Sequence, residues 1–138
     1  MLPSSINLLA VFLAGVAYMV VGFLWYSPML FGKKWMKLMG ISAEDMKKAQ
    51  KSMVKMYGIA FITGLVMAYI LGVFINLTPL ASTTDGLQVA FWAWLGFVAT
   101  VGVTSVIFAK KPLMLFYIDS AYQLAGMLVM SLVLTMWP

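Results

Sequence analysis

A single acidic residue stands inside the last apolar stretch of the chain, and it is the first candidate for chemistry. Tyr122 and Gln123 follow Asp119 at the spacing that puts side chains on one face of a helix. Thr100 and Thr104 of the preceding apolar stretch are candidate partners, because both stretches reach the same half of a membrane. Such a polar cluster could carry a proton, bind a cation or hold a polar ligand. The alternative is a hydrogen-bonded Asp119 that only fixes how the helices pack.

The residue types on which most enzymes depend are missing. The chain has no Cys and no His, and all nine of its basic residues are lysines. A thiolate nucleophile, the commonest general base and a guanidinium clamp for phosphate are therefore excluded. The pairs Met36–Met39 and Met53–Met56 have the spacing of thioether ligands for copper, but Met is also an adaptable apolar filler. We expect no catalytic residues, no metal and no cofactor, and so a protein that is not an enzyme.

The composition identifies the environment in which these residues act. The 138 residues are 64% hydrophobic and 9% charged, against about 45–50% and about 25% in soluble domains. This composition excludes a soluble enzyme, a nucleic-acid-binding domain and a disordered chain. We expect one integral membrane domain over residues 1–138, in contact with the lipid bilayer and not with nucleic acid.

Four apolar stretches are long enough to cross a bilayer, which needs roughly 20 residues per helix. They cover about residues 6–27, 56–77, 86–109 and 113–137. Backbone polar groups must be satisfied internally against lipid, so each stretch is predicted to be helical. The expected fold is an all-α, compact bundle of four transmembrane helices, with a short amphipathic interfacial helix between the first two.

The lysines predict how the bundle is oriented. Seven lie in the loop of about residues 28–55, between the first two stretches, and Lys110 and Lys111 lie between the last two. Neither terminus nor the loop between the second and third stretches carries a lysine. By the positive-inside rule we expect a multi-pass membrane protein, with the 28–55 loop in the cytoplasm and both termini outside.

Aromatic residues and proline mark the end of the first stretch. Trp25, Tyr26, Pro28 and Trp35 are expected to anchor the chain at the membrane interface. An alternative is that they form one wall of a site facing the cytoplasm. The segment after Pro28 reads as a short helix at the membrane surface that ends at Gly40.

The next helix should begin at Ser42, whose hydroxyl is suited to an N-cap. Its charged face predicts contact with anionic lipid headgroups, or with a groove on another protein. That face contains Lys47, Lys48, Lys51 and Lys55, and the apolar face contains Met46, Ala49, Met53 and Met56.

Small residues recur at every fourth position of the second stretch. This pattern lets helix backbones approach closely, so it predicts a packing face. The partner remains open between the first, third or fourth helix and another copy of the chain. The face consists of Ala60, Gly64, Ala68 and Gly72.

Several motifs resemble one known family. They are the run from Asn7 to Trp35 with its Trp-Tyr-Ser-Pro segment, the Trp94–Phe97 segment, and Leu115–Asp119 with Tyr122. Together they are similar to the bacterial membrane family catalogued as domain of unknown function 1761. The resemblance implies a compact four-helix protein of the bacterial cytoplasmic (inner) membrane and carries no established activity.

Two functions follow as hypotheses. The first is a non-enzymatic membrane module that self-associates as a homo-oligomer or serves as an accessory subunit of a membrane-protein partner. The alternative is a small-solute or proton transporter or channel that uses the polar face around Asp119. Four helices are few for enclosing a pathway, so the second hypothesis would require a dimer.

Overall fold

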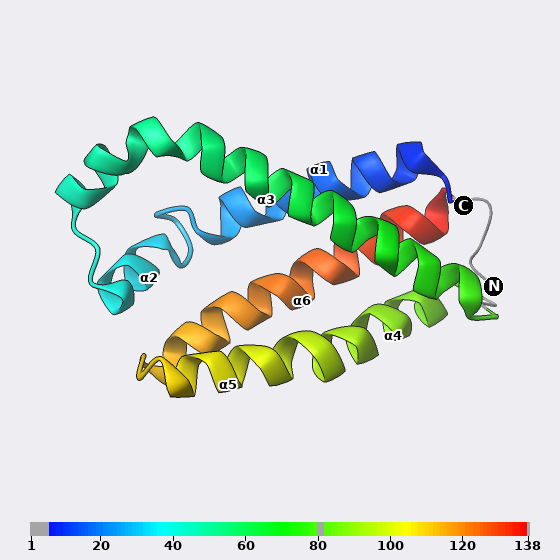
Figure 1. The fold of residues 1–138 in the computed structure, drawn as a ribbon. Helices are drawn as coiled ribbons and strands as arrows, with labels where there is room; N and C mark the ends of the chain where they lie inside the picture. Colours follow the sequence, from blue (N-terminus) through cyan, green and yellow to red (C-terminus); the bar gives the residue numbers. More distant parts are fainter. Residues whose placement is uncertain (1–5, 80–81, 138) are drawn as a thin grey trace.

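Four helices of the chain are long and apolar enough to cross a membrane. The computed structural model describes residues 6–79 and 82–137. The first, second and fourth crossings are α1 (Leu8–Trp25), α3 (Ala43–Leu77) and α6 (Leu113–Met136). The third crossing consists of α4 (Thr83–Ala93), the π-helical segment η1 (Trp94–Ala99) and α5 (Thr100–Phe108). A short helix, α2 (Gly32–Met39), lies between the first two crossings, and the predicted all-helical membrane fold is confirmed (Figure 1).

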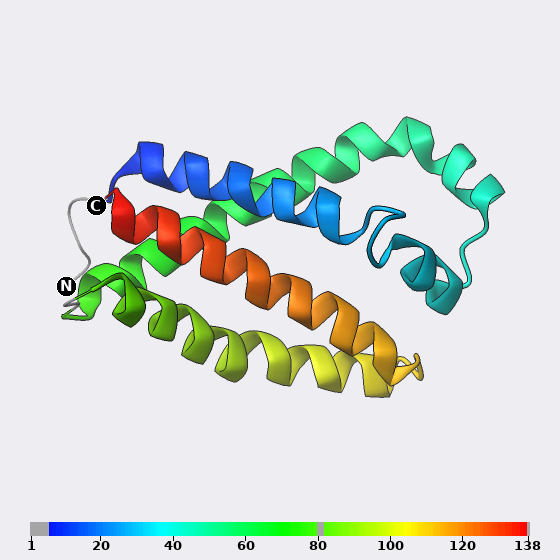
Figure 2. The same cartoon turned by 180° about the vertical axis from the view of Figure 1, so that it is seen from behind.

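The lysines gather at one end of the bundle. Figures 1 and 2 both show the start of α1 beside the end of α6, with α2, the start of α3 and the α5–α6 turn at the opposite end of the bundle. The Asn7 side-chain amide donates to the carbonyl of Trp137 at 3.3 Å, which ties the first and last helices together at the end far from the lysines. We call the other end, which carries residues 33–55 and the turn at residues 110–111, the lysine-bearing end.

The turn after α1 is compact because its backbone groups bond to one another. Helix α1 ends at Trp25, and the N–H of Gly32 donates to the carbonyl of Ser27 at 3.0 Å. A Cβ atom at position 32 would collide with the carbonyl oxygen of Tyr26. Only glycine therefore fits at the start of α2, and this turn brings α2 back towards the bundle.

The ends of the next two helices follow the predicted caps. Helix α2 ends at Gly40, which adopts a left-handed conformation with φ of 72°. Helix α3 begins with a capping box, in which Ser42 and Asp45 each hydrogen-bond the other's backbone N–H. The predicted N-cap is confirmed. Helix α3 has 35 residues, so the apolar stretch predicted at 56–77 is the second part of one continuous helix.

Three of the four residues of the small-residue face of α3 pack inside the same chain, whereas Ala60 lines a cavity. Ala68 is fully buried, and a Cβ atom at Gly64 would lie 3.0 Å from the ring of Tyr18 in α1. Gly72 faces Ile6 and Leu134, the latter in α6. The partners left open by the sequence are therefore α1 and α6. Close packing of backbones through small residues stabilises helix pairs in lipid.

The third crossing lies at the periphery. Its α4 part packs on α6, where Gly86 lies against Thr135. In α5 no residue is buried, and the side chains of Phe108 in α5 and Phe97 in the preceding η1 segment are 82% and 69% exposed. In a membrane such side chains contact lipid tails.

Candidate functional site

One turn of α6 collects hydrogen bonds from other parts of the bundle. The indole N–H of Trp25 donates to the carbonyl of Ile118 at 3.0 Å, and the indole N–H of Trp94 donates to the carbonyl of Ser120 at 2.8 Å. Between these carbonyls, the hydroxyl of Tyr26 donates to the carboxylate of Asp119 at 2.5 Å. We call residues 118–120 with these donors the α6 hub. It joins the end of α1 and the η1 segment to a single turn of α6.

Helix α2 packs against the same hub. The ring of Trp35 meets the ring of Tyr26 edge-on, with centroids 5.7 Å apart. The Asp119 carboxylate accepts the Tyr26 hydroxyl and is half-buried. A polar group in an apolar setting is costly unless it is hydrogen-bonded, so this donor helps the chain to tolerate an acid there.

A second polar contact lies deeper in the bundle, between α1 and α6. Tyr18 donates its hydroxyl hydrogen to the side-chain oxygen of Gln123 at 2.8 Å, and Tyr122 donates to the carbonyl of Tyr18 at 3.2 Å. The two tyrosine rings are 5.0 Å apart. Each ring lies over a glycine of the opposite helix: Tyr18 over Gly126, and Tyr122 over Gly22. The pair therefore needs both glycines in order to fit.

The predicted polar site is divided by the structure. Asp119 and Tyr122 both meet Tyr26, the first by a hydrogen bond and the second through ring centroids 5.4 Å apart. Gln123 instead binds Tyr18. The structure does not bring Thr100 and Thr104 to this group. Both are exposed on α5, and each hydroxyl donates to the carbonyl four residues earlier in the chain, a common way to satisfy a hydroxyl.

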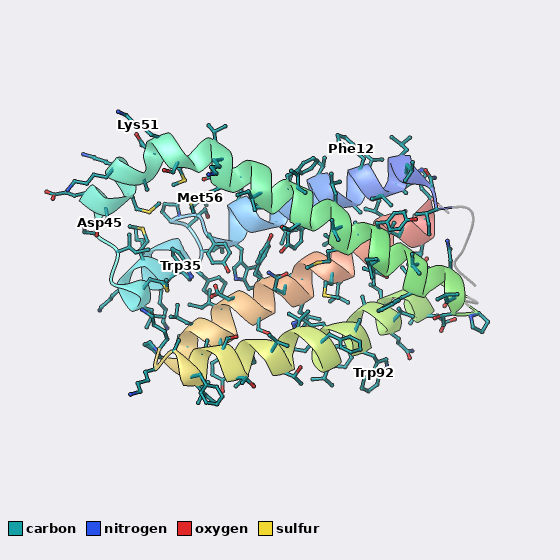
Figure 3. All side chains as sticks on the ribbon, in the orientation of Figure 1. Phe12, Trp35, Asp45, Lys51, Met56 and Trp92 are labelled. Carbon is teal, nitrogen blue, oxygen red and sulfur yellow. The ribbon has the colours of Figure 1, made fainter. Side chains whose placement is uncertain are left out.

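A cavity of about 650 Å³ opens beside the α6 hub, between the end of α1, helix α2 and the first part of α3. Its deep end is formed by Gly22, Tyr26 and Tyr122. Figure 3 shows Met56 and Asp45 on the side of α3 that faces Trp35, and Lys51 on the opposite side. The wall from α3 contains Met46, Ala49, Met53, Met56 and Ala60, and the wall from α2 and its ends contains Trp35, Met36 and Ile41.

Two charged residues also line this cavity, which is otherwise almost entirely apolar. They are Lys33, in the first turn of α2, and Asp45, in the first turn of α3. The carboxylate of Asp45 accepts the backbone N–H of Ser42 at 3.0 Å. Both charges belong to the lysine-bearing end. We call the end of the cavity at Lys33 and Asp45 its mouth, and the end at Gly22, Tyr26 and Tyr122 its deep end.

The expected interface anchors contribute to the hub and to the cavity. The polar atoms of Trp25 and Tyr26 point to α6, while Tyr26, Pro28 and Trp35 line the cavity. Asp119 is not part of the cavity lining. Tyr26 therefore has two roles at once: it holds Asp119 on one side and, together with Trp35, shapes the cavity on the other.

The cavity has the size and lining of a binding site. Over residues 6–79 and 82–137, no group of three or more His, Cys, Asp or Glu side chains lies close enough to hold a metal ion. Pockets that bind small molecules are mostly apolar, have volumes of about 300–1,000 Å³ and contain a few polar groups that set orientation. The cavity beside α3 meets this description.

Sequence reasoning missed one member of these clusters, Trp94. Trp94 sits at the start of the π-helical segment, and no local pattern indicated that its indole would reach α6.

Comparison with known families decides the membership of the chain. A family model described as Protein of unknown function (DUF1761) matches residues 9–135. The chain belongs to the DUF1761 family. The match spans all four crossings, the α6 hub and the whole cavity lining, so the resemblance noted in the sequence is confirmed. No curated protein and no solved structure matches the chain significantly.

Proposed function

We propose that this DUF1761 protein is a non-enzymatic accessory module of the bacterial cytoplasmic membrane that binds the apolar part of an amphipathic ligand beside α3. The single observation that supports this function is the cavity of about 650 Å³ with an apolar deep end and a charged mouth. Its wall of methionines adds adaptability, because the Met side chain is flexible and polarizable.

The proposed accessory role rests on this cavity and not on self-association. The small residues of α3 that suggested a second copy, such as Gly64 and Ala68, pack against helices of the same chain. A partner or ligand is therefore better accommodated at the lysine-bearing end. In the proposed orientation that end faces the cytoplasm, because all nine lysines lie there.

A neutral photoreactive probe tests the binding function. The purified protein in nanodiscs is irradiated with a long-chain alcohol that carries a diazirine, and the adducts are mapped by peptide mass spectrometry. We expect adducts at Met53 and Met56, and a loss of most of them in Ala49→Phe, whose ring fills the cavity. Val54→Phe is the matched control, because Val54 is 81% exposed on the same helix. Adducts spread evenly over lipid-facing positions and unchanged by Ala49→Phe would refute the proposed function.

Transport of a small solute or proton is the second candidate. It is favoured by one contact: Tyr26, which forms part of the deep end of the cavity, donates to Asp119. Flux into liposomes that is abolished by Asp119→Asn, in a variant with unchanged thermal stability, would support transport. Flux at the level of empty liposomes for the wild-type protein, or flux unchanged by Asp119→Asn, would dismiss it.

A further inference from the structure

The first part of α3 presents an apolar face that other described residues leave uncovered. Met46, Ala49, Met53 and Met56 recur at helical spacing along this face and line the cavity. Across the cavity stands Trp35 of α2. An amphipathic helix gains stability only when its apolar face is covered, so this face calls for an occupant that the chain itself does not supply.

The cavity and a membrane lipid share the same arrangement, with an apolar part deep in the membrane and a charged part near its surface. Its deep end, at Gly22 and Ala60, lies within the apolar crossings, and its mouth holds Lys33 and Asp45. A lipid entering from the side would place its acyl chain among the methionines and its headgroup at the charged mouth. A ligand from water would instead have to carry its apolar body past the charged residues.

The charges around the mouth of the cavity favour a lipid with an anionic headgroup. Residues 32–57 carry seven lysines against the two acids Glu44 and Asp45. Among the lysines, Lys33 lines the cavity, whereas Lys51 points away from it (Figure 3). Asp45 is held at the start of α3 by Ser42, and its charge keeps an anionic group on the Lys33 side of the mouth. Basic groups next to a membrane bind anionic lipids selectively.

We propose that the cavity binds an anionic lipid of the leaflet at the lysine-bearing end, with one acyl chain along the methionine face of α3 and the headgroup paired with Lys33. This inference rests on the proposed binding function and names its ligand class. The lysines that point outwards from α3, such as Lys51, then contact other headgroups without taking part in the site.

Lipid retention measured by native mass spectrometry tests this proposal. The protein is released from nanodiscs that contain equal amounts of phosphatidylglycerol and phosphatidylcholine, and the lipids that remain bound are counted. We expect phosphatidylglycerol to be retained about fivefold more than phosphatidylcholine, the preference that one lysine near a headgroup supplies. Lys33→Gln should remove most of this preference. Lys51→Gln, which makes the same charge change on the outer face, should preserve it.

The Ala49→Phe variant distinguishes a failure of the proposed binding function from a failure of the proposed ligand class. If Ala49→Phe reduces retention of both lipids but the wild type shows no preference for phosphatidylglycerol, the cavity binds and the ligand class is wrong. If Ala49→Phe reduces neither, the proposed binding function fails with it. A preference that Lys51→Gln removes and Lys33→Gln preserves would place the headgroup on the outer face and overturn the site. Lys33 is exposed, so Lys33→Gln should fold normally, and a thermal melt of this variant is the check.

Discussion

Tyr26 and Asp119 are 93 positions apart in sequence, and the phenol of the first donates to the carboxylate of the second at 2.5 Å. The bond joins the end of α1 to α6 at the lysine-bearing end of the bundle. Trp35 of α2 packs edge-on against the Tyr26 ring, with centroids 5.7 Å apart. Tyr26 therefore connects α1, α2 and α6. Tyr26 and Trp35 also line the cavity beside α3.

Removal of the Tyr26 hydroxyl should lower the stability of the bundle. Tyr26→Phe keeps the ring but leaves the Asp119 carboxylate with one donor fewer, which costs about 1–3 kcal/mol for a buried polar group. We expect a lower midpoint of thermal unfolding in detergent. Tyr117→Phe is the control, since Tyr117 lies two residues before Asp119 on α6 and is 56% exposed. Equal midpoints for Tyr26→Phe and the control would show that the bond adds no stability.

Substitutions of Asp119 should differ in stability according to whether they leave an acceptor for the Tyr26 hydroxyl. Asp119→Asn keeps a side-chain oxygen that can accept from Tyr26, whereas Asp119→Leu keeps none. We therefore expect Asp119→Leu to lower the free energy of unfolding by about 1–3 kcal/mol more than Asp119→Asn does. Chemical unfolding in mixed micelles, followed by tryptophan fluorescence, measures both. The reverse order would mean that the carboxyl group is not held by Tyr26.

The glycine beneath Tyr18 should tolerate no side chain. A Cβ atom at Gly126 would lie 2.5 Å from the Tyr18 ring, which itself is packed between α3 and α6. Overpacking of this kind costs about 1–3 kcal/mol. Gly126→Ala should thus unfold at lower temperature than the wild type. At Gly58 a Cβ atom meets nothing within 4 Å, so Gly58→Ala should leave the melting temperature unchanged or raise it. A stable Gly126→Ala protein would contradict the close contact between α1 and α6.

The features that local sequence determines were predictable, and the contacts that depend on helix rotation were not. Apolar length determines the four crossings, and Ser42 and Gly40 mark helix ends through their own backbone chemistry. The position of Thr100 and Thr104 depends on how the third crossing is turned about its axis. The π-helical segment before them changes that rotation, because its wider turn shifts every later side chain. Their hydroxyls consequently face away from Asp119 and bond to their own helix.

The Tyr26–Asp119 pair was hidden for a different reason. Each residue was recognisable as a polar group near an interface, but their contact depends on the compact turn at Gly32 and on the packing of α1 against α6. Pairings between segments so far apart in sequence leave no local periodic signal.

Labelling of single cysteines tests the proposed orientation. The chain contains no cysteine of its own, so Ser52→Cys reports only on the lysine-bearing end and Thr84→Cys only on the opposite end, where α1 begins and α6 ends. Both positions are exposed. Because positive charge is retained on the cytoplasmic side, a membrane-impermeant maleimide should label Thr84→Cys in intact cells and Ser52→Cys only after permeabilisation. Labelling of Ser52→Cys in intact cells would place the lysines outside. The cavity beside α3 would then open to the outer leaflet, and its lipid would have to come from there.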